Sequence, residues 1–206
     1  MKKLAYLGLP LAAILASCAS VPTQEEYRAK AIAMMKASFN EKGQAKLDRI
    51  DQDELQKICS IHPGGHDMPK EVGERIEKAQ QALIKYPADG KYLGDWKQGE
   101  RIAQSGVGKQ YSDNPKNPAG GNCYACHQLT KQELAYGTIG PSLYHFAKIR
   151  GFGADIQRYA WGKVFNSQAF TPCSSMPRFG HSGILTEEQI RHVVALLMSP
   201  DSPVNK

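Results

Sequence analysis

The sequence predicts an all-α protein, and two observations support that prediction. First, three segments have the pattern of a helix capping box, in which Thr or Asp is followed three residues later by Glu or Gln. Second, apolar residues recur after the last of these boxes at i, i+3, i+4 and i+7, the spacing of one buried helix face. The boxes are Thr23 with Glu26, Asp95 with Gln98, and Thr186 with Gln189, and the apolar positions are Ile190, Val193, Val194 and Leu197.

Length and composition limit the class of protein. The chain has 206 residues, of which 41% are hydrophobic and 22% charged, values typical of a soluble globular protein rather than a collagen-like or disordered one. The length suits one domain, or one domain with an appendage. The formal net charge of +6 is small and its basic residues are interleaved with acidic ones, so nucleic acid is not an expected partner.

The N-terminus has the features of an export signal. Two lysines precede an apolar stretch, residues 4–16, that is too short for a transmembrane helix and suits a signal peptide. The stretch leads into the letters LASC, which are similar to a bacterial lipobox, where the cysteine is acylated after cleavage. Residues 1–17 are therefore predicted to be the signal peptide and Cys18 the lipidated N-terminus. Cleavage after Ala19, which would discard Cys18, is the alternative.

Either form of processing places the mature chain outside the cytoplasm, where disulfides persist. With Cys18 acylated, the chain is expected in the periplasm and meets a membrane only through its lipid anchor. Ala19 and Ser20 follow the cysteine in place of the Asp that tends to hold lipoproteins at the inner membrane. The outer membrane is therefore the favoured site.

Cysteine spacing gives the strongest functional signal. Cys123 and Cys126 are followed at once by His127, which is the C-x-x-C-H pattern of covalent c-type haem attachment. Two thiols add to the two vinyl groups of one porphyrin, and the histidine that follows lies under the iron as an axial ligand. One motif predicts one covalent haem c. A thioredoxin-like redox pair and half of a zinc site are the alternatives, but a Gly/Pro/Asn-rich loop precedes the motif and no second ligand pair has zinc spacing.

The second axial ligand must come from elsewhere in the chain. Met176 is the preferred candidate because it lies in a loop, residues 171–180, whose prolines would hold a thioether over the far face of the haem. Met198 ends an apolar helical run and is expected in the core instead. His145 and His192 are expected at the surface or in packing, and His181 remains a less favoured alternative ligand to Met176.

Two cysteines, Cys59 and Cys173, are left over after the lipobox and the haem motif. In an oxidising compartment they are most simply paired as a disulfide. The alternative is that Cys173, three residues before Met176, is a reactive thiol or a haem ligand.

The segment between residues 92 and 200 resembles class I cytochrome c. The family crosses its first and last helices, and here the small residues Gly99 and Ala103 would let the last helix approach closely. A Gly-Pro pair after the haem motif orients the histidine in that family, which gives Pro141 this role by resemblance. The last helix lacks the aromatic residue usual in the family, and Trp96 is expected to fill that place.

The resemblance divides the chain into a helical extension, residues 18–90, and a cytochrome c domain, residues 91–206. Three helices are expected in the extension. The first would bury Tyr27, Ala31, Met34, Met35 and Phe39, the second would carry Leu47, Ile50, Leu55 and Ile58, and the third would carry Val72, Ile76, Ala79 and Leu83. The sequence leaves open whether the extension packs on the core, docks a partner or acts as a spacer.

Within the cytochrome family, residues 173–180 (CSSMPRFG), followed by an LTEEQI helix start, resemble SoxX, the small haem subunit of the periplasmic SoxAX complex. The resemblance implies that SoxA joins thiosulfate oxidatively to a cysteine of the carrier SoxYZ. The SoxX-like chain then accepts the electrons and passes them to a soluble cytochrome. It implies an electron-transfer subunit with no catalytic residue, in which Arg178 contacts a haem propionate or a partner carboxylate. The alternatives are a free-standing lipoprotein electron carrier of another respiratory chain, and a haem protein with an open ligand site.

Overall fold

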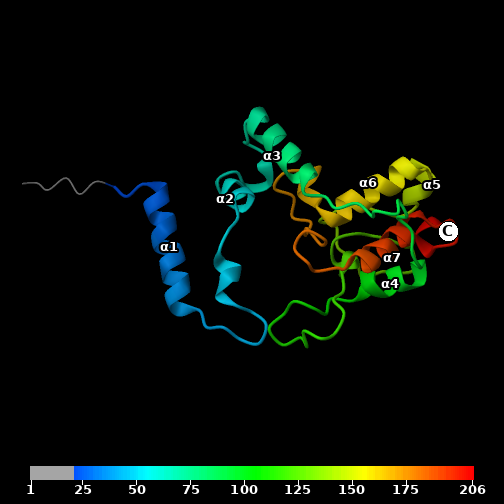
Figure 1. The fold of residues 1–206 in the computed structure, drawn as a ribbon, viewed down its shortest axis with the longest axis horizontal. Coiled ribbons are helices and arrows are strands. Elements are labelled where there is room, and N and C mark those ends of the chain that lie inside the picture. Colours follow the sequence, from blue (N-terminus) through cyan, green and yellow to red (C-terminus); the bar gives the residue numbers. More distant parts are fainter. Residues whose placement is uncertain (1–20) are drawn as a thin grey trace, which may run out of the picture. The chain divides into compact units, whose positions relative to one another are not determined.

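A computed structural model describes residues 21–206, and this part of the chain is helical and contains no β-strand (Figure 1). The all-α prediction is therefore confirmed. The described residues divide into two units, residues 21–39 and Asn40–Lys206. The predicted signal peptide and Cys18 lie outside the described residues. None of the described helices is long and apolar enough to cross a membrane.

The first unit contains helix α1 (Gln24–Ser38). Its predicted capping box is present, with the Glu26 N–H donating to the Thr23 hydroxyl at 3.2 Å and the Thr23 N–H donating back to the Glu26 carboxylate. The predicted burial of its apolar residues is wrong, because α1 has no buried residue and Met34 is 71% exposed. Residues 21–39 contain no second helix against which that face could pack.

The second unit begins with the short 3₁₀ turn η1 (Leu47–Ile50), which is followed by α2 (Glu54–Ile61) and α3 (Lys70–Ala82). A second 3₁₀ turn, η2 (Pro63–Gly65), joins α2 to α3. The single helix predicted through Leu47 and Ile58 is thus two elements. The break has a local cause, because Asp53 forms a capping box with Gln56 and so starts a new helix. Helix α3 is the third predicted helix and buries Ile76.

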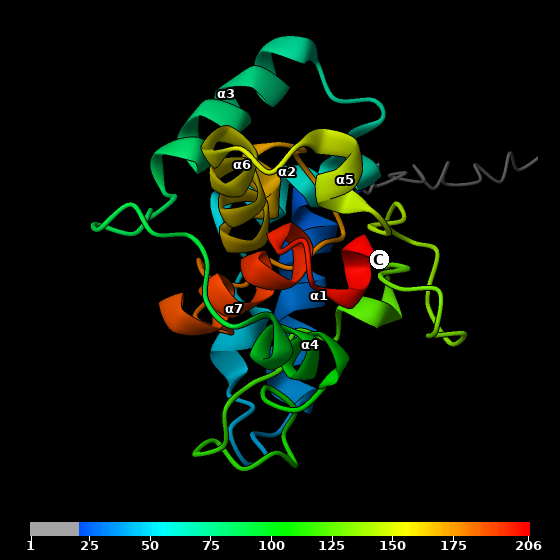
Figure 2. The same ribbon diagram turned by 90° about the vertical axis from the view of Figure 1, so that its right-hand side faces the viewer.

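The remaining elements form the packed core around α7 (Glu187–Met198), which lies between α4 (Trp96–Gln104) and α6 (Ala154–Phe165) (Figure 2). Along α7 the predicted stripe is buried, including Ile190 and Val194 at 0% exposure. The helices approach closely at Gly99, where a side-chain carbon would collide with the His192 carbonyl. The predicted crossing of the helix that carries Gly99 (α4) with the last helix (α7) is confirmed. The shorter elements are η3 (Cys123–Ala125), α5 (Phe146–Arg150), η4 (Ser167–Ala169) and η5 (Pro203–Asn205).

Two details of this crossing differ from the prediction. Asp95 caps α4 through the Lys97 N–H at 2.8 Å, and its own N–H donates to His192 Nδ1 at 2.9 Å instead of completing a capping box. Trp96 is only partly buried and does not belong to the core. The large aromatic group of the core is instead Trp161 on α6, which is 1% exposed.

Residues 40–90 are part of the same compact unit as the helices that follow them. The Trp161 indole N–H donates to the Lys85 carbonyl at 2.9 Å. The Asn166 amide donates to the Gln80 backbone and side-chain oxygens at 3.1 and 3.0 Å, in a buried position. The unit therefore starts at Asn40, whereas the predicted domain boundary lies at residue 90.

Candidate functional site

The C-x-x-C-H motif forms a single tight turn, η3. Asn122 before it has a left-handed backbone with φ 45°, which redirects the chain into the turn. The N–H groups of Cys126 and His127 both donate to the Cys123 carbonyl, at 3.1 and 2.9 Å. Both thiols and the imidazole are thus fixed to one backbone turn, the arrangement that a doubly attached porphyrin with an axial histidine requires.

The His127 ring is held from the opposite side by residues 140 and 141. Its Nδ1 lies 2.7 Å from the Pro141 carbonyl, which can only accept, so Nδ1 carries the proton and Nε2 is left as the ligating nitrogen. Gly140 is pressed against the ring, and any side chain there would collide with it. The Gly140 N–H donates to the Cys126 carbonyl at 2.8 Å, which fastens this segment to the motif. This is the position that the sequence predicts for Pro141.

The two motif cysteines fit a haem better than the alternatives. Neither is in a disulfide. Burial raises the pKa of the Cys123 thiol to about 12, whereas a redox-active pair needs a lowered pKa to form its thiolate. Within residues 21–206 no three His, Cys, Asp or Glu side chains come together as a metal site, so a zinc site has no set of ligands there.

A buried carboxyl joins the motif to α4. The Tyr124 hydroxyl donates to Glu100 Oε1 at 2.9 Å, and the Gln104 amide donates to the same atom. Glu100 Oε2 is buried without a hydrogen-bond partner. Burial raises the pKa of Glu100 above its ordinary value, and it does the same for Tyr124. This half-buried pair fixes η3 against the helix crossing.

Met176 is partly buried and packs against the same core cluster as Cys123. Its backbone is held by side chains on both sides, because the Ser167 hydroxyl donates to its carbonyl and its N–H donates to the Ser174 hydroxyl. Gln168 braces the preceding residues by accepting from the Cys173 N–H at 2.7 Å and donating to the Ser174 carbonyl at 3.0 Å. The loop that carries Met176 is therefore built to keep one shape.

The other ligand candidates are mostly engaged elsewhere. Met198 is 2% exposed in the core, as predicted. The His145 ring lies 2.7 Å from the Lys206 carbonyl and stacks on Tyr144, and His192 accepts the N–H at the start of α4. His181 is exposed and lines a cavity next to the Met176 loop.

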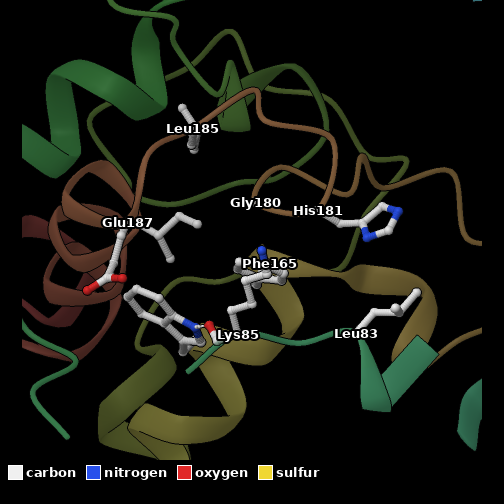
Figure 3. Close-up of a pocket in the computed structure, with 9 residues that line it drawn as sticks. Leu83, Lys85, Phe165, Gly180, His181, Leu185 and Glu187 are labelled. Carbon is white, nitrogen blue, oxygen red and sulfur yellow. Dashed lines mark hydrogen bonds between the residues drawn. The ribbon is translucent and has the colours of Figure 1, made fainter. Parts of the chain in front are cut away.

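This cavity, of about 420 Å³, opens between α6, α7 and the loop after Met176 (Figure 3). Its wall combines apolar side chains with a few charged ones. Leu185 connects it to the haem motif, because Leu185 and the Cys123 sulfur both border Gly121. The lining residues are Leu83, Lys85, Trp161, Phe165, Gly180, His181, Leu185, Glu187 and Ile190.

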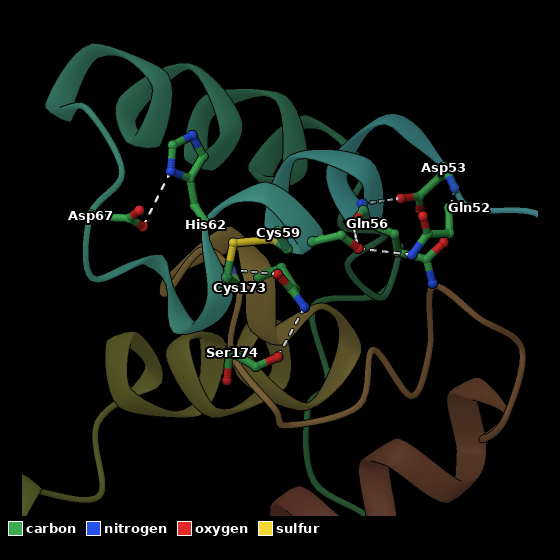
Figure 4. The surroundings of a disulfide bond; sticks show 10 residues. Gln52, Asp53, Gln56, Cys59, His62, Asp67, Cys173 and Ser174 are labelled. Carbon is green, nitrogen blue, oxygen red and sulfur yellow. Dashed lines mark hydrogen bonds and ion pairs between the residues drawn. A yellow bond between two sulfur atoms is a disulfide. The ribbon is translucent and has the colours of Figure 1, made fainter. Parts of the chain in front are cut away.

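Cys59 and Cys173 are joined by a disulfide, so Cys173 is not a free thiol in this structure (Figure 4). Arg178, on the other side of Met176, pairs through Nη2 with the Asp53 carboxylate at 2.7 Å. Its Nη1 is buried without a hydrogen-bond partner among the described residues. An unpaired buried guanidinium donor suits an anionic group such as a porphyrin propionate.

Asp53 is the site residue that sequence reasoning missed. Burial alone would raise its pKa, but the Gln56 N–H and the Arg178 guanidinium outweigh that effect and lower it. The capping-box spacing of Asp53 and Gln56 is visible in the sequence and would have placed the start of α2. Nothing in the sequence pairs Asp53 with an arginine 125 residues away. Ser167 and Gln168 were also missed, because no sequence motif marks a side chain that will hydrogen-bond the backbone of a nearby loop.

A curated sequence relative and a similar solved structure are found by comparison with known proteins. No family model matches the chain. An uncharacterized lipoprotein of Aquifex aeolicus (strain VF5) is 40% identical over 164 residues, which cover 75% of this chain and 73% of the relative. The crystal structure of SoxXA from P. pantotrophus is 26% identical, covers 52% of this chain and 82% of its own, and superposes with a TM-score of 0.37.

Proposed function

The chain belongs to the same family as the Aquifex aeolicus lipoprotein, and we propose that it is an exported, lipid-anchored c-type cytochrome with one covalent haem. The observation that carries this proposal is the turn Cys123–Ala125, with Cys126 and His127 directly after it and the His127 ring fixed by Pro141. The lipid anchor would be Cys18, and the expected compartment is the periplasm, with the outer membrane favoured.

Each site residue has a separate task in this function. Cys123 and Cys126 would hold the porphyrin covalently, and His127 would bind the iron through Nε2. Met176 would also hold the iron, from its braced loop, and Arg178 would contact a propionate through its unpaired Nη1. The haem supplies reversible one-electron transfer. The protein orients the ligands and keeps the ring in apolar surroundings, and a thioether ligand favours the reduced iron.

A finer proposal follows from the resemblance of residues 173–180 to SoxX. The chain would be the electron-accepting subunit of a SoxAX-type complex, with SoxA as its heterodimer partner. SoxA would join thiosulfate to a SoxYZ cysteine, and this chain would pass the electrons on to a soluble cytochrome. No catalytic residue is assigned to the chain itself. The second candidate is a free-standing lipoprotein electron carrier of another respiratory chain, which the same haem site would serve.

The haem proposal is tested on full-length protein expressed in a host that matures c-type cytochromes. Haem that stays with the polypeptide after denaturation, at one haem per chain, supports covalent attachment. The Cys123→Ser and Cys126→Ser double variant should lose it. The charge-transfer band of Met-ligated ferric haem should disappear in Met176→Ala and persist in Met198→Leu, a control in the core. A haem-free wild-type chain would refute the proposal.

Partner and anchor need separate experiments. Purification of the tagged chain from its own host should bring down a second haem-bearing polypeptide if the SoxAX-type assignment is correct, and thiosulfate with carrier protein should then reduce the haem. A single species with one haem favours the free-standing carrier.

The Cys18→Ala variant should move the protein from the membrane fraction to the soluble fraction, and an unchanged distribution would contradict lipidation.

A further inference from the structure

Helix α2 is fastened to the Met176 loop at two points that lie on either side of Met176. Cys59, inside α2, forms the disulfide with Cys173, three residues before the methionine. Asp53, at the start of α2, forms the ion pair with Arg178, two residues after it. The methionine is therefore bracketed between two ties to one short helix. Figure 4 shows Cys59 bonded to Cys173, and Asp53 at the start of the same helix.

One carboxylate holds both the helix and the loop. Asp53 Oδ1 accepts the Gln56 N–H at 2.7 Å and so caps α2, while Oδ2 accepts from Arg178 Nη2 at 2.7 Å. The Arg178 side chain is only 10% exposed, and Asp53 is the partner of its Nη2. If the carboxylate is removed, this nearly buried Nη2 loses its charged acceptor, only the proposed propionate contact of Nη1 is left, and the side chain is no longer tied to α2.

The disulfide ties the loop at a point farther from Met176 along the chain than the ion pair does. Its loop end, Cys173, has φ 59° in the left-handed region, and two residues separate it from the methionine. On the other side only Pro177 stands between Met176 and Arg178. The proline ring fixes its own φ and restricts the residue before it to extended conformations. A displacement of Arg178 is therefore passed to Met176 through a stiff link.

We propose that Asp53 is a positioning residue for Met176, and that α2 acts through it as a clamp that keeps the methionine over the haem. The inference rests on the proposed haem function and deepens it, because it assigns to residues 40–90 a task that their sequence does not reveal. Loss of the Asp53–Arg178 pair frees the loop on the side of Pro177. The methionine then competes less well with an external ligand for the haem iron.

The test uses the haem-loaded, full-length protein and two variants of Asp53. Asp53→Asn keeps a good helix cap and removes the charge, whereas Asp53→Ala removes both. Glu54→Gln is the matched control, because it removes the neighbouring charge, which forms only an exposed pair with Arg75 of little energetic value. Imidazole, which displaces methionine from ferric haem, is titrated against each protein, and amide hydrogen exchange is followed at Cys173, Ser174 and Met176.

The expected result is that Asp53→Asn binds imidazole about tenfold more tightly than wild type, which corresponds to about 1.4 kcal/mol. Its loop amides should exchange faster, and Glu54→Gln should match wild type in both measurements. Asp53→Ala should show at least the effect of Asp53→Asn. Wild-type imidazole affinity in Asp53→Asn overturns the positioning role, even if the loop amides exchange faster or the variant melts earlier.

The outcomes separate this inference from the function on which it rests. A wild-type protein with covalent haem and the Met–iron band, but with no effect of Asp53→Asn on imidazole binding, refutes the clamp and leaves the cytochrome proposal standing. A wild-type protein that holds no haem refutes the cytochrome proposal, and the positioning role falls with it.

Discussion

Gly99 and Gly73 are both helical glycines, but a methyl group at each would meet different surroundings. At Gly99, on α4, the new carbon would collide with the His192 carbonyl of α7 and crowd the Leu196 side chain. At Gly73, on α3, its nearest neighbour is the Met68 sulfur at 3.8 Å, an ordinary contact. The same substitution, Gly→Ala, therefore tests the helix crossing against a matched control.

The expected loss of stability in Gly99→Ala follows from this geometry. Helix α4 must move away from α7 by roughly 1 Å before the new carbon and the carbonyl oxygen reach van der Waals separation, and such a gap forfeits about a quarter to a half of the dispersion attraction across it. We take the upper part of the overpacking range, about 2–3 kcal/mol. Ala in place of Gly stabilises a helix by about 1 kcal/mol, which offsets part of this loss. Gly99→Ala should thus destabilise the protein by about 1–2 kcal/mol, or about 2–8 °C in Tm.

The assay is thermal unfolding of haem-loaded protein followed by far-ultraviolet circular dichroism. Gly73→Ala should have a Tm at or above that of wild type, because it gains helix propensity without a clash. Gly99→Ala should melt below wild type at equal haem content. If the two variants shift in the same direction, or if Gly99→Ala is the more stable, the close approach of α4 and α7 at this point is wrong.

Three further predictions concern the haem motif, α7 and the buried carboxyl. Gly140→Ala should reduce the yield of correctly ligated haem several-fold, because its side chain displaces the His127 ring; an unchanged absorption spectrum would contradict this. Thr186→Ala removes the hydroxyl that accepts the Gln189 N–H and caps α7, so the free energy of unfolding should fall by about 1 kcal/mol. Urea unfolding should then show a lower midpoint and an unchanged dependence of the free energy on urea concentration. Glu100→Gln should stabilise the protein at pH 7, because burial raises the folded pKa of Glu100 and the charged form is the destabilised one. That advantage should shrink as the pH falls through the folded pKa toward the ordinary value of 4.5, where the wild-type carboxyl gains its proton, and a pH-independent difference would refute the assignment.

The features that the sequence predicted correctly are those set by neighbouring residues. The stripe from Ile190 to Leu197 and the cap at Thr186 define α7, because helix periodicity and capping act within a few residues. The turn of the C-x-x-C-H motif is equally local, since it brings together Cys123, Cys126 and His127, and its binding of haem stays a prediction. Even the close approach at Gly99 has a local signal, because small residues four apart create a groove on one helix.

The errors arose where distant residues decide the outcome. Trp96 was expected in the core because it adjoins the crossing, but Trp161 occupies the core and is held there by the Lys85 carbonyl. The apolar residues of α1 were expected to be buried because their spacing is helical, yet spacing alone provides no surface to pack against. A hydrophobic pattern shows which face of a helix is available for burial, and only the partner decides whether burial occurs.

The extension that the sequence set apart from the cytochrome domain supplies hydrogen-bond acceptors and a counter-charge to that domain. A chain reduced to residues 91–206 would leave the indole N–H of Trp161 and the buried amide of Asn166 without acceptors. It would also leave Arg178 without its carboxylate partner, at a cost comparable to that of any unpaired buried charge. Trp161 lies on α6, Asn166 directly follows that helix, and Arg178 is two residues after Met176. Residues 40–90 thus belong to the same packed unit as the Met176 loop, and that unit begins well before the C-x-x-C-H motif.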